Sequence, residues 1–146
     1  MRTFERVINS SMGGEGNNLW MREFGGGVET LGGLAYITEA LLQSHEGFLR
    51  FFPGVPPREG ASFAGLRARG GLVVNATLAE DGSVHGVRVL SEQGQNISVL
   101  SPGGGRVSVV DITTSGVVST TSRKVREAWV REFSTRRGGA YELAFA

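Results

Sequence analysis

The amino-acid sequence predicts a mainly β protein, an antiparallel β-sandwich that follows a short helical stub. Three observations lead to this prediction. Of the 146 residues, 23 are glycines, and they stand in short clusters between apolar segments, as in turn-rich β proteins. About eight short apolar segments then follow one another at the spacing of strands in a sandwich. One clear helical pattern precedes them, near the N-terminus.

The helical pattern starts after Thr30, a residue type that commonly caps helix N-termini. The sequence predicts a helix from Leu31 to about Ser44, stopped by Gly47. Apolar residues also occupy the other faces of this helix, so we expect it to be buried on most sides. Its core stripe follows the i, i+3, i+7 spacing and consists of Leu34, Ile37 and Leu41.

After Gly47 the sequence changes to short strands separated by turn signals. Residues 53–62, PGVPPREGAS, are predicted to form a loop, because no central strand tolerates these prolines. Asp81 and Gly82, between two apolar runs, are the strongest hairpin signal. The predicted strands are FLRFF, GLRAR, GLVVNATLAE, VHGVRVL, QNISVL, GRVSVVDI, GVVSTT, EAWVREF and YELAFA.

Composition excludes several classes of function. The formal net charge is only +1, so we predict no nucleic-acid partner. There is no cysteine, which excludes disulfides and thiolate metal sites. No apolar run approaches the ~18 residues of a membrane-spanning helix, so no membrane partner is predicted.

His45 and His85 are the two histidines of the chain. They form no HxH or HExxH spacing, so we predict no metal site, and no cofactor motif is present. His45 is expected at the C-terminus of the helix, where a partial positive charge complements the helix dipole. His85 is expected to face solvent from a strand.

Glu29 is the catalytic candidate among the acidic residues. A sugar-cleaving site needs carboxylates that flank a cleft, and Glu29 stands immediately ahead of the buried helix. A carboxylate in this place is equally an ordinary partner of the helix dipole. The residues alone leave both interpretations of Glu29 open, the catalytic one and the structural one.

Arg67 and Arg69 alternate with apolar residues on one predicted strand, so both should project from one face. They would either clamp a carboxylate of a neighbouring domain or form a solvated strand face. A second basic cluster is offset by nearby acids, which argues against nucleic-acid binding; it consists of Arg123, Lys124 and Arg126, with Glu127 and Glu132.

Two long stretches carry a resemblance to a known family. They are EALLQSHEGFLRFFPGVP and GASFAGLRARGGLVVNATLAEDGSVHGVRVLSEQG. Together they resemble the C-terminal part of the α-L-fucosidases of glycoside hydrolase family 95, whose catalytic domain closes with a helix and an MLLQSHEG-like pattern. A proline-bearing strand segment and GLRARGGF follow there in the same order. The resemblance runs from about Gly27 to Gly105.

The resemblance implies an inverting glycosidase with an (α/α)6 catalytic barrel and no cofactor. Residues 1–46 would be the C-terminal end of that barrel, including its last helix, and residues 47–146 a β-sandwich C-terminal domain. The rest of the barrel would be the partner of this chain, and a carbohydrate the substrate of the whole enzyme. Neighbouring barrel helices would explain the all-round apolarity of the predicted helix.

One departure from the family concerns the site. The family typically carries DGNFGG ahead of the last helix, with an aspartate that helps to orient the asparagine activating water. Here the matching stretch is VETLGG, so Val28 stands in the place of the aspartate, and Glu29 is its candidate substitute. A divergent branch of the family carries a glutamate in this place.

Two alternative functions remain from the sequence. A carbohydrate-binding module would need an exposed aromatic platform, for which Trp129 and Tyr141 are the candidates, although alternation along the strand favours burial of Trp129. A purely structural sandwich would be stable only against its barrel. The isolated chain would then aggregate through its apolar helix.

Overall fold

The computed structural model describes residues 35–56, 58–101, 104–125 and 128–146. The chain divides into two compact units, Met1–Glu39 and Ala40–Ala146. Residues 35–39 are the described part of the first unit. The second unit holds all strands of the described residues, so strand pairing begins before the predicted boundary at residue 47.

The helix of the described chain covers residues 35–41 and ends before the predicted Ser44. Its predicted last turn is wrong, because Leu42–Gln43 form strand β1, which pairs antiparallel with β2, Arg50–Phe51. The extended backbone buries the Leu42 side chain, which is 4% exposed. Tertiary pairing and burial here outweigh the helical preference of the local sequence.

The turn between β1 and β2 holds two residues that the sequence assigns to the helix end. Gly47 does not stop the helix; its φ of +84° serves this turn, since glycine adopts left-handed conformations without steric cost. His45 also lies in the turn and is exposed. The expected interaction of His45 with the helix dipole is therefore wrong.

The segment after β2 caps the C-terminal end of the helix. The N–H groups of Phe52 and Gly54 donate to the carbonyl oxygens of Leu41 and Ala40, at 2.8 and 3.0 Å. These bonds satisfy carbonyls that have no partner within the helix. Gly54 lies so close to the helix that a Cβ atom on it would stand 2.8 Å from Cβ of Ala40.

Replacing Gly54 with alanine is expected to lower the free energy of unfolding by about 1–3 kcal/mol, because the added methyl group overpacks the contact with Ala40. Urea unfolding of the chain measures this change. In the double variant that also carries Ala40→Gly, the part of the steric cost that comes from the Ala40 methyl group should disappear, while the close approach to Cα of Ala40, at 2.9 Å, remains. Strictly additive costs of the two substitutions would contradict this explanation.

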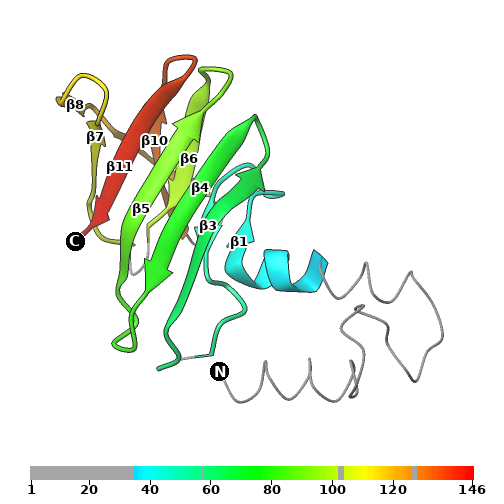
Figure 1. Ribbon diagram of the computed structural model, residues 1–146. Coiled ribbons are helices and arrows are strands. Elements are labelled where there is room, and N and C mark those ends of the chain that lie inside the picture. Colours follow the sequence, from blue (N-terminus) through cyan, green and yellow to red (C-terminus); the bar gives the residue numbers. More distant parts are fainter. Residues whose placement is uncertain (1–34, 57, 102–103, 126–127) are drawn as a thin grey trace. The chain divides into compact units, whose positions relative to one another are not determined.

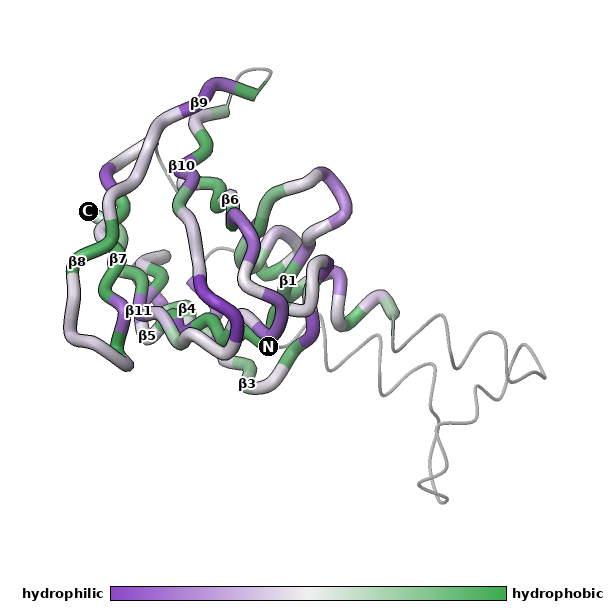
Figure 2. The backbone as a smooth tube through the Cα atoms, turned by 90° about the horizontal axis from the view of Figure 1, so that it is seen from above, coloured by the Kyte–Doolittle hydropathy of each residue, from purple (hydrophilic) through white to green (hydrophobic). Residues whose placement is uncertain are grey.

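A six-stranded antiparallel sheet forms one layer of the fold (Figure 1). Residues along its strands alternate between the core and the outer face, as in β4 (Leu72–Leu78), where Leu72, Val74 and Ala76 are buried. Figure 2 shows the hydropathy of each described residue along the backbone. In spatial order the strands are β3 (Ala61–Ala68), β4 (Leu72–Leu78), β5 (Val84–Ser91), β11 (Gly139–Phe145), β7 (Val107–Asp111) and β8 (Gly116–Val118).

A three-stranded antiparallel sheet forms the second layer, in the order β6 (Asn96–Leu100), β10 (Ala128–Ser134) and β9 (Thr121–Val125). One hydrophobic cluster joins both sheets. Phe133 of β10 packs against Tyr141 of β11, with ring centroids 5.9 Å apart. The predicted antiparallel β-sandwich is therefore confirmed.

Most predicted strands are present in the structure. The predicted hairpin at Asp81 and Gly82 joins β4 to β5, and Ala79 N–H donates to the carbonyl oxygen of Ser83 at 2.9 Å. The predicted loop 53–62 is wrong at its end, since β3 begins at Ala61. Among the described residues, no helix has the length and apolarity needed to cross a membrane.

Candidate functional site

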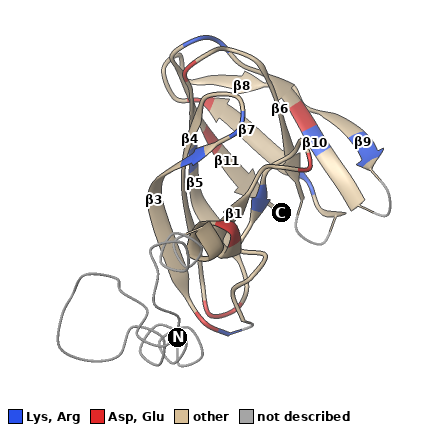
Figure 3. Ribbon diagram, turned by 90° about the vertical axis from the view of Figure 1, so that its right-hand side faces the viewer, with Lys and Arg blue, Asp and Glu red and all other residues tan. Residues whose placement is uncertain are grey.

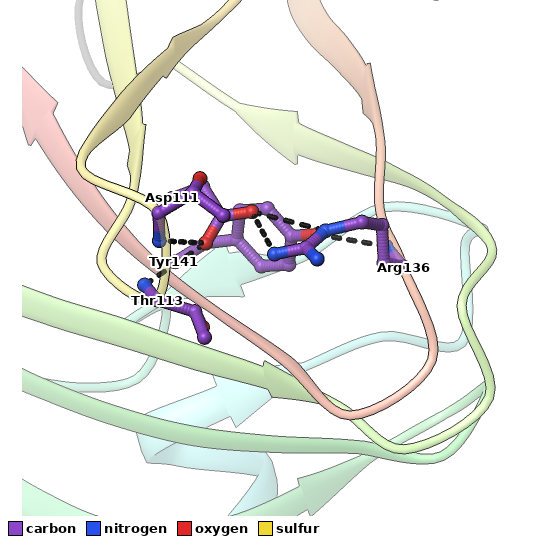
Figure 4. A network of polar contacts seen from close by, with 5 residues as sticks. Asp111, Thr113, Arg136 and Tyr141 are labelled. Atoms are coloured by element: carbon purple, nitrogen blue, oxygen red, sulfur yellow. Dashed lines mark hydrogen bonds and ion pairs between the residues drawn. The ribbon is translucent and has the colours of Figure 1, made fainter.

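A buried carboxylate anchors a polar network at one end of the sandwich (Figure 4). Asp111 ends strand β7 and is 6% exposed. Its Oδ2 accepts hydrogen bonds from Nη2 and Nε of Arg136, at 2.6 and 3.2 Å. Its Oδ1 accepts from the N–H groups of Thr113 and Thr114, at 2.9 and 3.2 Å. The carboxylate is thus fully engaged by its own chain.

The electrostatics of the network favour the charged carboxylate. Burial by itself raises the pKa of Asp111, but the hydrogen bonds from Arg136, Thr113 and Thr114 outweigh it. The pKa of Asp111 therefore lies below its usual value. A carboxylate held ionised, with both oxygens occupied, is suited to fixing loops rather than to transferring protons.

The same network fixes the loop between β10 and β11. The phenolic oxygen of Tyr141 accepts a hydrogen bond from the backbone N–H of Arg136 at 2.7 Å. Oγ1 of Thr135 lies 2.8 Å from Oγ of the fully buried Ser91. These contacts give polar groups inside the sandwich their hydrogen-bond partners.

The structure separates Arg67 and Arg69, which the sequence places together. Arg67 on β3 forms two hydrogen bonds with the carboxylate of Glu92, at 2.9 and 3.2 Å. The side-chain hydrogen bond from Arg67 lowers the pKa of Glu92. Arg69 lies beyond the end of β3, in the turn before β4. The two arginines therefore do not form one clamp.

The other predicted residues occupy the following places. Glu29 and Val28 lie outside the described residues, so the catalytic assignment stays a prediction. His85 is exposed on β5, as predicted. Among the described residues, no group of three or more His, Cys, Asp or Glu side chains could hold a metal ion.

The two candidates for an aromatic platform differ in exposure. Tyr141 is 1% exposed and belongs to the core, so it cannot join a platform. Trp129 is 47% exposed, and the expectation that it is buried is wrong. Its neighbour Val130 takes the buried position on β10, while Trp129 pairs with Lys124 on the edge strand β9.

The basic cluster around Arg123 is offset by acids, as the sequence predicts. Nε of Arg123 on β9 lies 3.6 Å from the carboxylate of Glu132 on β10. Figure 3 shows both signs of charge on these two strands. The described part of this cluster therefore presents no uniform positive surface to a nucleic acid.

A pocket of about 290 Å³ lies where three chain segments meet, the β1–β2 turn, the β3–β4 turn and the start of β6. We call it the Arg69 pocket. Its floor is apolar and its rim carries hydroxyl, amide, imidazole and guanidinium groups. The lining residues are Ser44, His45, Gly47, Phe48, Leu49, Arg69, Gly70, Leu72, Gln95, Asn96, Ile97 and Ser98.

Backbone contacts between the turns hold the rim of the Arg69 pocket. The N–H of Arg69 donates to Oγ of Ser44 at 3.0 Å. Nη1 of Arg69 donates to the carbonyl oxygen of His45 at 3.3 Å. The amide of Gln95 lies directly over Gly70, where a Cβ atom would stand 1.6 Å from its Nε2. The absence of a side chain at residue 70 therefore makes room for Gln95.

The sequence does not predict this pocket, although it points to Arg69 itself. The three segments are far apart in the chain, and none carries a motif of its own. The one usable signal is the Gly70–Gly71 pair, because adjacent glycines between two strands indicate a tight turn. Such a turn predicts where Arg69 leaves the strand, but not which residues face it.

Comparison with protein families gives a match. The model of the family described as glycoside hydrolase family 95, C-terminal domain, matches residues 43–143, well over half of the chain. The match begins within β1 and ends within β11. A search of curated proteins finds no match to the chain.

Proposed function

Because the chain belongs to glycoside hydrolase family 95, in which residues 43–143 match the C-terminal domain, we propose that it is the sandwich end of an inverting, α-L-fucosidase-like enzyme. In this proposal the sandwich buttresses an (α/α)6 catalytic barrel. The segment before residue 43 contributes the end of the barrel, and the supporting domain begins near residue 43, where the family match starts, rather than at the predicted residue 47. The substrate of the whole enzyme is a carbohydrate.

The observation that carries this proposal is the family match and where it begins. The helix of residues 35–41 ends two residues before residue 43, at which the match starts. The N–H groups of Phe52 and Gly54 bind the last helical carbonyls. The end of the helix is thus held by hydrogen bonds from the backbone of the segment after β2. Such an attachment is what we expect of a domain that supports a helical barrel.

Glu29 has a place in this proposal as the residue that replaces the family aspartate. A glutamate here would accept a hydrogen bond from the side-chain amide of an asparagine and so orient the group that activates water. Inversion also needs a general acid on the opposite face of the sugar, ~6.5–9.5 Å away. In this proposal the general acid belongs to another part of the barrel and is not supplied by residues 1–146.

The purified chain alone is expected to release no sugar from aryl α-L-fucosides, because it holds at most one of the two catalytic groups. Release of fucose is measured by reducing-sugar assay over a range of pH. A matched Glu29→Gln variant is the control for contaminating glycosidases. Hydrolysis by the chain that disappears in the Glu29→Gln variant would contradict the proposal.

The buttressing role is tested by binding. The chain should form a one-to-one complex with a family 95 catalytic domain from which the C-terminal domain has been removed, measured by size-exclusion chromatography with light scattering. The variant Gly54→Ala, which disturbs the helix cap, should bind more weakly. Failure of the unmodified chain to bind any such catalytic domain would overturn the proposed role.

A further inference from the structure

The described lining of the Arg69 pocket is rich in hydrogen-bond donors and contains no Asp or Glu. Arg69 carries the positive charge, and no carboxylate of the described residues forms an ion pair with it. A planar guanidinium is suited to binding a carboxylate through two parallel hydrogen bonds. The charge of this pocket therefore favours an anion with a single negative charge.

The remaining polar groups favour a ligand that carries hydroxyl groups beside its carboxylate. The amide of Gln95 is held by packing over Gly70 and can both donate and accept. Oδ1 of Asn96 accepts from Oγ of Ser134 at 2.8 Å, which leaves its NH₂ group as a donor. Oγ of Ser44 accepts from Arg69 N–H and retains its own hydrogen to donate.

The floor and size of the pocket limit the shape of the ligand. The apolar part of the lining comes from Phe48, Leu49, Leu72 and Ile97, which are buried and leave a small apolar area for the C–H groups of a sugar ring. A volume of about 290 Å³ is at the lower end of small-molecule sites. It fits a single ring rather than a chain of sugars.

We infer that the Arg69 pocket binds a small sugar that carries a carboxylate, a hexuronate, with the carboxylate on Arg69 and the ring over the apolar floor. The ligand is either a free uronate or the terminal residue of an acidic glycan. This inference concerns the sandwich alone and does not rest on the proposed catalytic role. Binding to the isolated chain and activity of the whole enzyme can therefore fail separately.

The test is a titration of the full 146-residue chain, isotope-labelled for NMR, with methyl glucuronide. We expect signals of the Gly47 and Gly70 backbone amides and of the Gln95 side-chain amide to shift, with a dissociation constant of about 1 mM or lower. Methyl glucoside and acetate are the comparison ligands, since one lacks the carboxylate and the other the ring. Equal affinity for either of them, or no shift with the glucuronide, would overturn the inference.

Matched variants assign the carboxylate contact. Arg69→Gln should weaken glucuronide binding by about ten- to hundredfold. Arg67→Gln, on the neighbouring strand β3 but outside the pocket, should leave the affinity unchanged. Gln95→Glu keeps the size of the side chain and adds a negative charge, so it should abolish binding of the glucuronide. Equal weakening by Arg67→Gln and Arg69→Gln would refute the assignment.

An acidic oligosaccharide distinguishes the two sources of the ligand. A glucuronide-terminated disaccharide that binds as tightly as methyl glucuronide, with the same signals shifted, identifies the terminal residue of a glycan as an acceptable ligand. Binding of methyl glucuronide but not of the disaccharide restricts the pocket to a single uronate ring. Binding of neither would overturn the inference.

Discussion

Replacing Gly94 with alanine is expected to lower the free energy of unfolding by about 3 kcal/mol or more. Two causes add. The φ of Gly94 is +70°, a left-handed conformation that strains any residue with a Cβ atom. The added Cβ would also stand 2.3 Å from the backbone nitrogen of Arg137 and 2.9 Å from the carbonyl carbon of Arg136. A backbone cannot move aside as a flexible side chain can.

Gly138→Ala is the matched control for this prediction. Gly138 has a φ of +72° and lies in the adjacent loop, but a Cβ atom added to it would have no other atom within 4 Å. It should therefore show the conformational cost alone, about 1–2 kcal/mol. Guanidinium unfolding of both variants measures the difference. Equal costs for Gly94→Ala and Gly138→Ala would show that the close approach contributes nothing.

The close approach at Gly94 explains how the end of the sandwich is closed. The N–H of Gly138 donates to the carbonyl oxygen of Ser91 at 2.7 Å, and that of Thr135 to Gln95 at 3.2 Å. The loop after β5 and the loop before β11 thus form one layer of backbone over the core. This layer also sets the position of Gln95, which lies at the rim of the Arg69 pocket.

The strands can be predicted where one face of the sheet is buried. Strand β5, Val84–Ser91, alternates apolar and polar residues, and its predicted end lies within one residue of the observed end. Burial alternates in β7 as well, but the residue types do not follow it throughout, because Val110 is exposed and Asp111 is buried. The period of two is therefore written in the sequence only where apolar residues take the buried positions, as Val87 and Val89 do in β5.

The sequence cannot predict structure that depends on edges or distant partners. Strand β9, Thr121–Val125, carries mostly polar, exposed residues and shows no apolar alternation. Its pairing with β10 provides the hydrogen bonds that define it. Likewise, the helix ends at residue 41 because Leu42 pairs with Phe51, a contact that local helix propensity does not contain.

The candidate site is predictable only in part, for the same reason. The sequence points to Arg69 as a binding residue to consider, but the strand ends at Ala68, so the expected alternation with Arg67 stops there. Asp111 and Arg136 are far apart in the chain. They meet because β7 pairs with β11, which is not its neighbour in sequence.

Replacing Asp111 with asparagine is expected to lower the melting temperature by roughly 10 °C at pH 7. The variant keeps the shape of the side chain but removes the charge that pairs with Arg136 at 2.6 Å. It also weakens the acceptors for the N–H groups of Thr113 and Thr114. Thermal unfolding followed by circular dichroism measures the change.

The pH dependence of this effect follows from the pKa of Asp111, which folding lowers. The stabilisation is fully present above the unfolded pKa, about 3.9. It is lost as the pH falls through the lower folded pKa, because the unfolded chain binds the proton first. The gap in melting temperature between the two proteins should thus be constant from pH 7 to about 5 and close towards pH 2.

Glu92→Gln is the control that separates a buried from an exposed carboxylate. The pKa of Glu92 is also lowered, by its hydrogen bond with Arg67, but both side chains of that pair are largely exposed. Solvent screens such pairs, so this variant should change the melting temperature little at any pH. A gap for Asp111→Asn that stays the same from pH 7 to pH 2 would show that the charge of Asp111 does not stabilise the fold, and that the loss comes from the weaker acceptors for Thr113 and Thr114.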